Sequence, residues 1–184
     1  MKIITVIPAR KGSKRLKHKN VYLLNNIPLI EYTINAALKS KYISKENLYI
    51  NTDFDEVIDI AKKRNIQIIE RPEHLAGDKV WTQPVINHTE DELGGLDDED
   101  IIVILQANSP QMTSEKIDEC IDMLIDNDLL DVHTIDSTMI NNGAIQVIKR
   151  KVRDIKGKVC YNGVVMTDWI DVHTIEDINK IGEL

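Results

Sequence analysis

Residues 3–20 read IITVIPARKGSKRLKHKN. The first five are mostly β-branched and predict a strand buried on both faces. Pro8 ends this strand because it fixes φ and removes a backbone donor. The loop that follows holds Gly12 and Ser13 among six lysines and arginines. A buried strand that opens into such a loop is typical of a phosphate site, since backbone N–H groups can face the anion while the side chains neutralise it. A merely solvated basic surface is the alternative, and it does not explain the Gly-Ser placement.

The charge of the chain is unevenly distributed. The 184 residues carry a net charge of −7, yet residues 1–30 hold seven lysines and arginines and no acid. An acidic body with one basic region disfavours nucleic acid and favours a small polyanion. The sequence shows no apolar run long enough for a membrane span and no signal-peptide pattern. Cys120 and Cys160 fit no metal or disulfide spacing, so we expect no membrane partner and a cytoplasmic location.

Strand patterns alternate with helix patterns along most of the chain. Strands are expected at 48–51, 66–70 and 101–106, and helices at 28–39, 84–93 and from Ser114, with Asp53 as the N-cap of the helix near 57–61. This order predicts βαβ units in one α/β domain over residues 1–184, a Rossmann-like three-layer fold with a mostly parallel central sheet. Ligands bind at the carboxyl ends of such strands, where Arg10, Asp53, Gln106 and Ser109 would lie.

The last third of the chain is less regular. Strands are expected at 131–137 and 144–149, a hairpin turning at Asn162-Gly163 within 160–165, and a short strand at 170–173. Thr174 and Asp177 have the spacing of a capping box for a final helix. The segments 131–136 and 171–176 both begin Asp-Val-His-Thr-Ile. Two such strands could share a metal, but we favour a coincidence of strand-forming residues, because nothing in the sequence shows that the two strands face each other.

Six motifs, in order along nearly the whole chain, resemble those of the CMP-sialic acid synthetase family of cytidylyltransferases. They are Ile-Pro-Ala-Arg-Lys-Gly-Ser-Lys at 7–14, Asn-Thr-Asp at 51–53, Arg-Pro…Leu-Ala-Gly-Asp at 71–78, Leu-Gln-Ala-Asn-Ser-Pro at 105–110, Asn-Gly-Ala-Ile at 142–145 and Ile-Asp-Val-His-Thr-Ile-Glu-Asp at 170–177. The resemblance implies a nucleotidyltransferase that transfers CMP from CTP to a 2-keto sugar acid of the nonulosonic, sialic-acid-like type and releases pyrophosphate.

The resemblance also implies roles for particular residues. Arg10, Lys19 and Asp171 would be catalytic, and Gln106, Ser109 and Asn142 would bind the sugar acid. The nucleotide would be held by Ala9, Arg10, Gly12, Ser13, Lys14, Asn20, Arg71 and Thr82. Asp171 and His173 would hold Mg²⁺, or Mn²⁺ because a histidine is a softer ligand than the carboxylate usual there. Arginine and lysine suit this reaction, because phosphoryl transfer needs positioning and positive charge.

Three departures from the family pattern keep alternatives open. His173 replaces a carboxylate, Asn108 replaces a threonine, and the dimerisation arm expected near 138–142 is largely missing. The missing arm predicts a monomer or an atypical homodimer. One alternative is a cytidylyltransferase for a smaller sugar acid, and another is a nucleotide-binding module with impaired catalysis.

Overall fold

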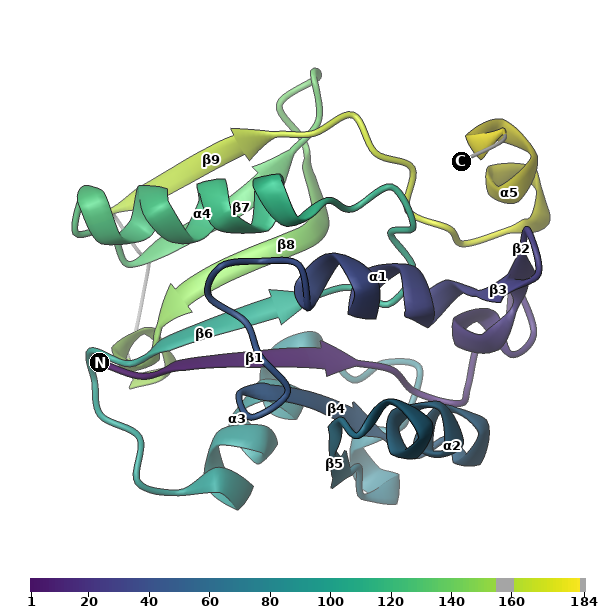
Figure 1. Ribbon diagram of the computed structural model, residues 1–184, viewed down its shortest axis with the longest axis horizontal. Helices are drawn as coiled ribbons and strands as arrows, with labels where there is room; N and C mark the ends of the chain where they lie inside the picture. The colour runs from purple at the N-terminus through teal and green to yellow at the C-terminus, as the bar shows by residue number, and fades with distance from the viewer. Residues whose placement is uncertain (155–160, 183–184) are drawn as a thin grey trace.

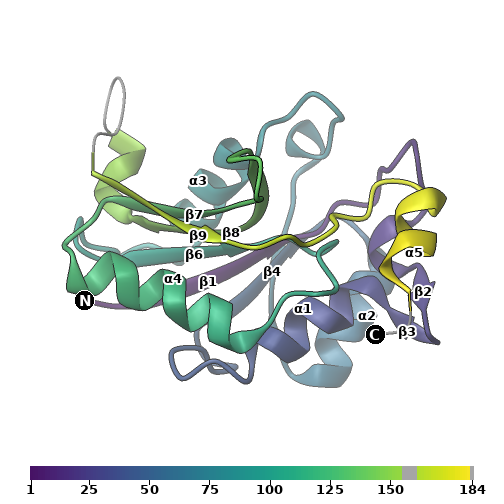
Figure 2. The ribbon, with the colours of Figure 1, turned by 90° about the horizontal axis from the view of Figure 1, so that it is seen from above.

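A seven-stranded sheet runs through the middle of the molecule, with helices on both faces (Figures 1 and 2). The structure is a computed structural model and describes residues 1–154 and 161–182. The strand order is β5-β4-β1-β6-β8-β7-β9. The strands are β1 (Ile3–Pro8), β4 (Leu48–Thr52), β5 (Gln67–Glu70), β6 (Ile101–Leu105), β7 (Asp131–Ile135), β8 (Asn141–Lys149) and β9 (Asn162–Met166).

Strand direction confirms the predicted fold class. β1 pairs in parallel with β4 and β6, β4 with β5, and β7 with β9, while β8 pairs antiparallel with both β6 and β7. Within the described part of the chain, β8 alone therefore runs against the other strands of this sheet. The carboxyl ends of the parallel strands consequently share one edge.

The helices form the outer two layers. Their bounds are α1 (Leu29–Ala37), α2 (Asp55–Arg64), α3 (Thr82–Leu93), α4 (Ser114–Asp126) and α5 (Ile175–Ile181), with single 3₁₀ turns η1 (Lys19–Val21), η2 (Glu73–Leu75) and η3 (Arg150–Asp154). A small ribbon pairs β2 (Leu23–Leu24) with β3 (Ile27–Pro28). No helix in the described ranges is long and apolar enough to cross a membrane.

The core explains why β1 is apolar at all positions except Thr5. Ile7 packs in the larger cluster with α1, α2 and α4, whereas Val6 packs against Ile86 of α3 on the opposite face. Each fully buried side chain of this size contributes about 1.5–3 kcal/mol. A strand covered on both faces must therefore be apolar at successive positions, as the sequence predicted.

Three local predictions are wrong. The N-cap of α2 is Phe54, and the Asp53 carboxylate instead accepts a hydrogen bond of 2.8 Å from the backbone N–H of Lys11. Asn162 and Gly163 do not turn a hairpin but begin β9, which pairs with β7; Cys160, where that hairpin was to start, lies outside the described residues. Residues 170–173 form no strand. The capping box of α5 is confirmed at Thr174 and Asp177.

The connection from β7 to β8 is a short turn. The Asp136 carboxylate accepts hydrogen bonds from the backbone N–H groups of Thr138 (2.9 Å) and Ile140 (3.0 Å). The backbone of Asp136 also exchanges hydrogen bonds with Met139 and Ile140. One carboxylate thus satisfies most donors of this turn.

Candidate functional site

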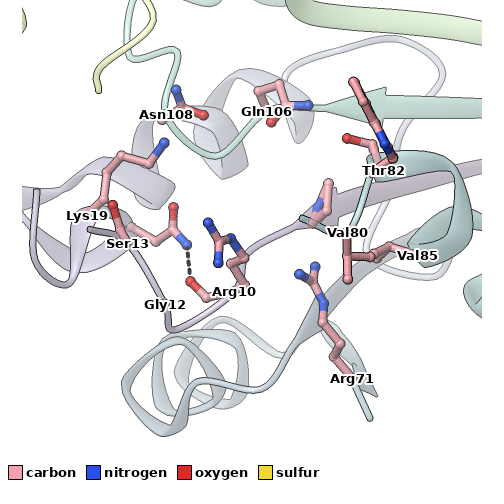
Figure 3. Close-up of a pocket in the computed structure, with 13 residues that line it drawn as sticks. Arg10, Gly12, Ser13, Lys19, Arg71, Val80, Thr82, Val85, Gln106 and Asn108 are labelled. Atoms are coloured by element: carbon pink, nitrogen blue, oxygen red, sulfur yellow. Dashed lines mark hydrogen bonds between the residues drawn. The ribbon is translucent and has the colours of Figure 1, made fainter. Parts of the chain in front are cut away.

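A cleft opens at the carboxyl ends of β1, β4 and β6 (Figure 3). It is lined by residues from five parts of the chain: Pro8, Arg10, Gly12, Ser13, Lys19, Asn20, Arg71, Val80, Trp81, Thr82, Val85, Gln106 and Asn108. A second pocket, lined by Lys14, Arg15 and His173 among others, shares Arg10, Ser13 and Lys19 with the cleft. The two together form one concave, strongly basic surface.

The loop after β1 is held from both sides. Its Lys11 N–H donates to Asp53, as described, and the Asn20 side-chain amide donates to the Arg10 carbonyl at 2.9 Å. Gly12 allows the Arg10 side chain to lie against the loop, since a Cβ at Gly12 would be 3.2 Å from Arg10 Nη1. These contacts position the basic loop before any ligand arrives.

An internal carboxylate occupies part of this basic surface. Asp78 Oδ1 lies 2.7 Å from Arg10 Nη1, and Asp78 Oδ2 lies 2.5 Å from Lys14 Nζ. Hydrogen bonds from Lys14 and Arg10 lower the pKa of Asp78. In this state, the two cations are partly neutralised by the protein itself.

Lys19 is a half-buried cation of the site. Burial lowers its pKa from 10.5 to about 8, with the neighbouring Arg15 and Arg10 acting in the same direction and Asp171 opposing them. A half-buried ammonium surrounded by other cations lacks a full counter-charge. An anion bound beside it would therefore be strongly favoured.

Arg71 lies at the opposite end of the cleft from Lys19 (Figure 3). It is only 7% exposed, and its Nε and Nη2 donate to the side-chain and backbone oxygens of Asn51, both at 2.8 Å. Asn51 is held in turn by Thr89 of α3 at 3.0 Å. Burial lowers the pKa of Arg71 to about 10. Arg71 lines the cleft, and Nη1 is not used in these two hydrogen bonds to Asn51, so the guanidinium can still donate to a ligand.

Asp171 is positioned at the site by hydrogen bonds between Asn108 and Val172, which are far apart in the sequence. The Asn108 side chain donates to the Val172 carbonyl at 3.0 Å, and the Val172 N–H donates to the Asn108 carbonyl at 2.8 Å. Ser109 Oγ donates a hydrogen bond to Asp171 Oδ1. Burial raises the pKa of Asp171 to about 6, although Ser109 and Lys19 favour its charged form.

His173 lies beside the basic loop that follows β1, in the second pocket. Its Nδ1 is 3.4 Å from Arg15 Nη2, and its backbone N–H donates to Asp177. Burial, together with Lys19 and Arg15, lowers the pKa of His173. Across residues 1–154 and 161–182, no three His, Cys, Asp or Glu side chains gather as a ready-made metal site.

Most of the predicted site residues come together. The cleft contains Arg10, Gly12, Ser13, Lys19, Asn20, Arg71, Thr82 and Gln106, the adjoining pocket contains Lys14 and His173, and Ser109 bonds to Asp171 beside them. Four line neither hollow: Ser109 and Asp171, which bond to each other, and Ala9 and Asn142. Ala9 is fully buried, and the side-chain amide of Asn142 bonds to Thr134 and Thr167.

Seven residues that line the two hollows were given no site role from the sequence: Pro8, Arg15, Asp78, Val80, Trp81, Val85 and Asn108. Asp78 belongs to one of the six motifs, but nothing in the local sequence indicates that its carboxylate pairs with Arg10, 68 positions earlier in the chain. Val80 and Trp81 directly precede Thr82, so the adjacency to a predicted ligand residue was the available signal. Val85 follows one helical turn later on α3.

Comparison with known proteins places this fold and site in a family. Residues 4–153 match the family model described as "Cytidylyltransferase". The chain belongs to the cytidylyltransferase family, as the motifs indicated.

Particular relatives include N-acylneuraminate cytidylyltransferase of Streptococcus agalactiae serotype V, 33% identical over 129 residues, a match that covers 70% of this chain and 30% of that protein. CMP-N,N'-diacetyllegionaminic acid synthase of Legionella pneumophila is 37% identical over 128 residues, covering 67% and 53%. The chain thus spans about half or less of the length of these relatives. A solved CMP:2-keto-3-deoxy-manno-octonic acid synthetase in complex with CTP has the same fold, with a TM-score of 0.76, 15% identity and coverage of 98% and 97%.

Proposed function

We propose that this chain binds CTP and transfers CMP to the anomeric hydroxyl of a 2-keto sugar acid of the nonulosonic type, releasing pyrophosphate. The observation that carries this proposal is one cleft with two different ends. Lys19 supplies positive charge at one end and Arg10 in the middle, and buried Arg71 lies with Thr82 at the other end (Figure 3). That division suits a triphosphate joined to a base. The relatives named above support the choice of CTP and of a sugar acid.

The reaction asks the protein mainly for positioning and charge. The sugar hydroxyl oxygen forms a bond to the α-phosphorus while the bond from that phosphorus to the pyrophosphate oxygen breaks. Arg10 can contact phosphate oxygens through a fork of N–H donors, and Lys19 adds a point charge. Both residues already lie in the cleft, so little rearrangement precedes the transfer.

A divalent metal fits the residues on one side of the site. Mg²⁺ binds through one or two carboxylates together with substrate phosphates, and Asp171 is a half-buried carboxylate beside the basic loop whose pKa is raised by burial. When bound, the metal would neutralise phosphate oxygens as the pyrophosphate leaves. We propose Asp171 as its ligand and His173 as a second one through Nε2, since Nδ1 faces Arg15. An imidazole ligand makes Mn²⁺ the alternative to Mg²⁺.

The acceptor would lie beside β6 and β8. Gln106 follows β6 and lines the cleft, and its amide can both donate and accept hydrogen bonds. Leu105 pairs with Ile145, so Asn142 extends beyond the end of β6 toward the same edge. We propose that Gln106, Ser109 and Asn142 contact the sugar acid. The short turn at 136–140 leaves this side open, so we propose a monomer or an atypical homodimer, which light scattering can distinguish.

The test is calorimetric titration of the protein with CTP, ATP, GTP and UTP, first with Mg²⁺ and then with Mn²⁺, followed by a pyrophosphate-release assay with a panel of sugar acids. Selective CTP binding and pyrophosphate release are the expected results. Arg10→Ala is expected to lose at least about tenfold in CTP affinity, because a charge-assisted hydrogen bond contributes ~1.5–3 kcal/mol. CTP binding without turnover for any acid or metal would refute the enzymatic proposal. We also propose a cytoplasmic location, with which the free, buried thiol of Cys120 agrees.

A further inference from the structure

Trp81 is an unusually exposed tryptophan on the wall of the cleft. Its side chain is 83% exposed, although large apolar residues are normally at least half buried. It is the N-cap residue of α3, with an extended backbone. Within residues 1–154 and 161–182, the indole makes no hydrogen bond and no ring contact. The fold therefore gains little from a tryptophan at this position.

The surroundings of Trp81 differ from the rest of the cleft. Its neighbours in sequence, Val80 and Thr82, lie with Val85 at the end away from Lys19 (Figure 3). Of the cations that line the cleft, buried Arg71 lies near this end, whereas Lys19 lies at the other end. This end thus combines an apolar wall, the hydroxyl of Thr82 and the fixed guanidinium of Arg71. Such a surface suits a flat, uncharged group with hydrogen-bonding edges.

The loop that carries Trp81 also contacts Arg10, a residue that we propose binds phosphate. Arg10 Nη1 reaches the Ala76 carbonyl at 3.4 Å as well as the Asp78 carboxylate. Val80 N–H closes a turn onto the Gly77 carbonyl at 3.1 Å. A short, turn-stabilised segment therefore separates the indole from a residue proposed to bind phosphate. A single ligand can contact both Arg10 and the indole of Trp81 if its charged part is covalently linked to an aromatic ring.

We propose that Trp81 is a base-binding residue whose indole stacks on the face of the pyrimidine ring of the nucleotide. This inference rests on the proposed function and names one contact of the same site. Stacking on an aromatic side chain tolerates every base, because each has a π-face. The indole therefore supplies affinity, while discrimination between bases falls to the hydrogen-bonding groups of Arg71 and Thr82.

The test uses the intrinsic fluorescence of Trp81. The chain has two tryptophans, so Trp169→Phe leaves Trp81 as the single reporter. This protein is titrated with CTP, cytidine and inorganic tripolyphosphate. We expect CTP and cytidine to change the emission and tripolyphosphate to leave it unchanged. In calorimetry, Trp81→Ala should lose at least about fivefold in CTP affinity and nothing in tripolyphosphate affinity, and Trp81→Phe should retain most of the CTP affinity.

Tyr161→Ala is the matched control. Tyr161 is another exposed aromatic residue, at 66%, and it precedes β9 at the sheet edge opposite the cleft. Its removal should leave CTP affinity unchanged. If CTP binds but Trp81→Ala has wild-type affinity, the stacking role is overturned while the proposed function stands; a change in oligomeric mass in that variant would assign Trp81 to a protein interface. If the wild type binds no nucleotide, the proposed function itself fails and the inference with it.

Discussion

Replacing Lys19 with methionine should make the protein more stable at pH 7 and remove its affinity for a triphosphate. Methionine keeps the aliphatic stem of the side chain without the charge. The pKa of Lys19 falls from 10.5 to about 8, so the folded state carries the ammonium at pH 7 against a solvation penalty. At about 1.4 kcal/mol for each pKa unit, this difference corresponds to on the order of 3 kcal/mol.

The neighbouring Asp171 reduces the expected gain. Its carboxylate and the Lys19 ammonium stabilise each other's charged forms, so removing the lysine would raise the pKa of Asp171 further above about 6. We therefore expect a net gain in the free energy of unfolding of about 1–3 kcal/mol at pH 7.

The gain should depend on pH. Between about pH 8 and 10.5, the unfolded chain keeps the Lys19 proton that the folded wild type has lost, so the stability of the wild type rises with pH in this range. The advantage of Lys19→Met is then full below pH 8 and disappears by about pH 10.5.

Urea denaturation at pH 7 and at several alkaline pH values measures this difference. Lys14→Met is the matched control from the same loop, since the Lys14 side chain is 83% exposed and forms an ion pair with Asp78. The stability of this variant should match that of the wild type to within about 0.5 kcal/mol. A Lys19→Met protein that is less stable than the wild type at pH 7, or whose advantage does not decline with pH, would refute the burial argument.

Three further substitutions test other parts of the structure. Arg71→Lys should lower the free energy of unfolding by about 2–4 kcal/mol and weaken CTP binding, because lysine cannot reproduce the two hydrogen bonds of the buried guanidinium; denaturation and calorimetry measure both. Asp78→Asn should tighten CTP binding several-fold at low salt, since Arg10 is released from its internal partner, and less at high salt; weaker binding would show that Asp78 positions Arg10 instead. Gly163→Ala should cost about 1–3 kcal/mol because its Cβ would lie 2.7 Å from Met123 Sδ; a lower Tm with unchanged CTP affinity is expected, and an unchanged Tm would contradict it.

The basic loop and the edge on which it lies could be predicted from the sequence, because both follow from local patterns. An apolar strand, Pro8, and a Gly-Ser pair among cations are adjacent in the chain, and alternating strands and helices place their ends together. The predicted residues Arg10, Lys19 and Gln106 accordingly line one cleft.

Features that depend on contacts between distant segments could not be predicted in this way. Aspartate is a favoured N-cap residue, but the Asp53 carboxylate accepts a hydrogen bond from the backbone N–H of Lys11, 42 positions earlier in the chain. The segment 170–173 has the β-propensity of a strand, but it pairs with Asn108 through two hydrogen bonds and joins no sheet. Propensity describes what a segment favours alone, and tertiary partners decide between near-equal options.

The reversed direction of β8 has a consequence for how the edge of the sheet that carries the cleft can be extended. Because β8 runs against β7, the turn at 136–140 that joins them lies at the edge of the sheet that carries the cleft. Met139 and Ile140 in that turn are 67% and 63% exposed, so no packed neighbour limits its length. A longer loop inserted there would add a wall beside the cleft while leaving every strand of the sheet in register. The shape of this side of the cleft can therefore change without a change in the core, and this turn is the position at which it can change.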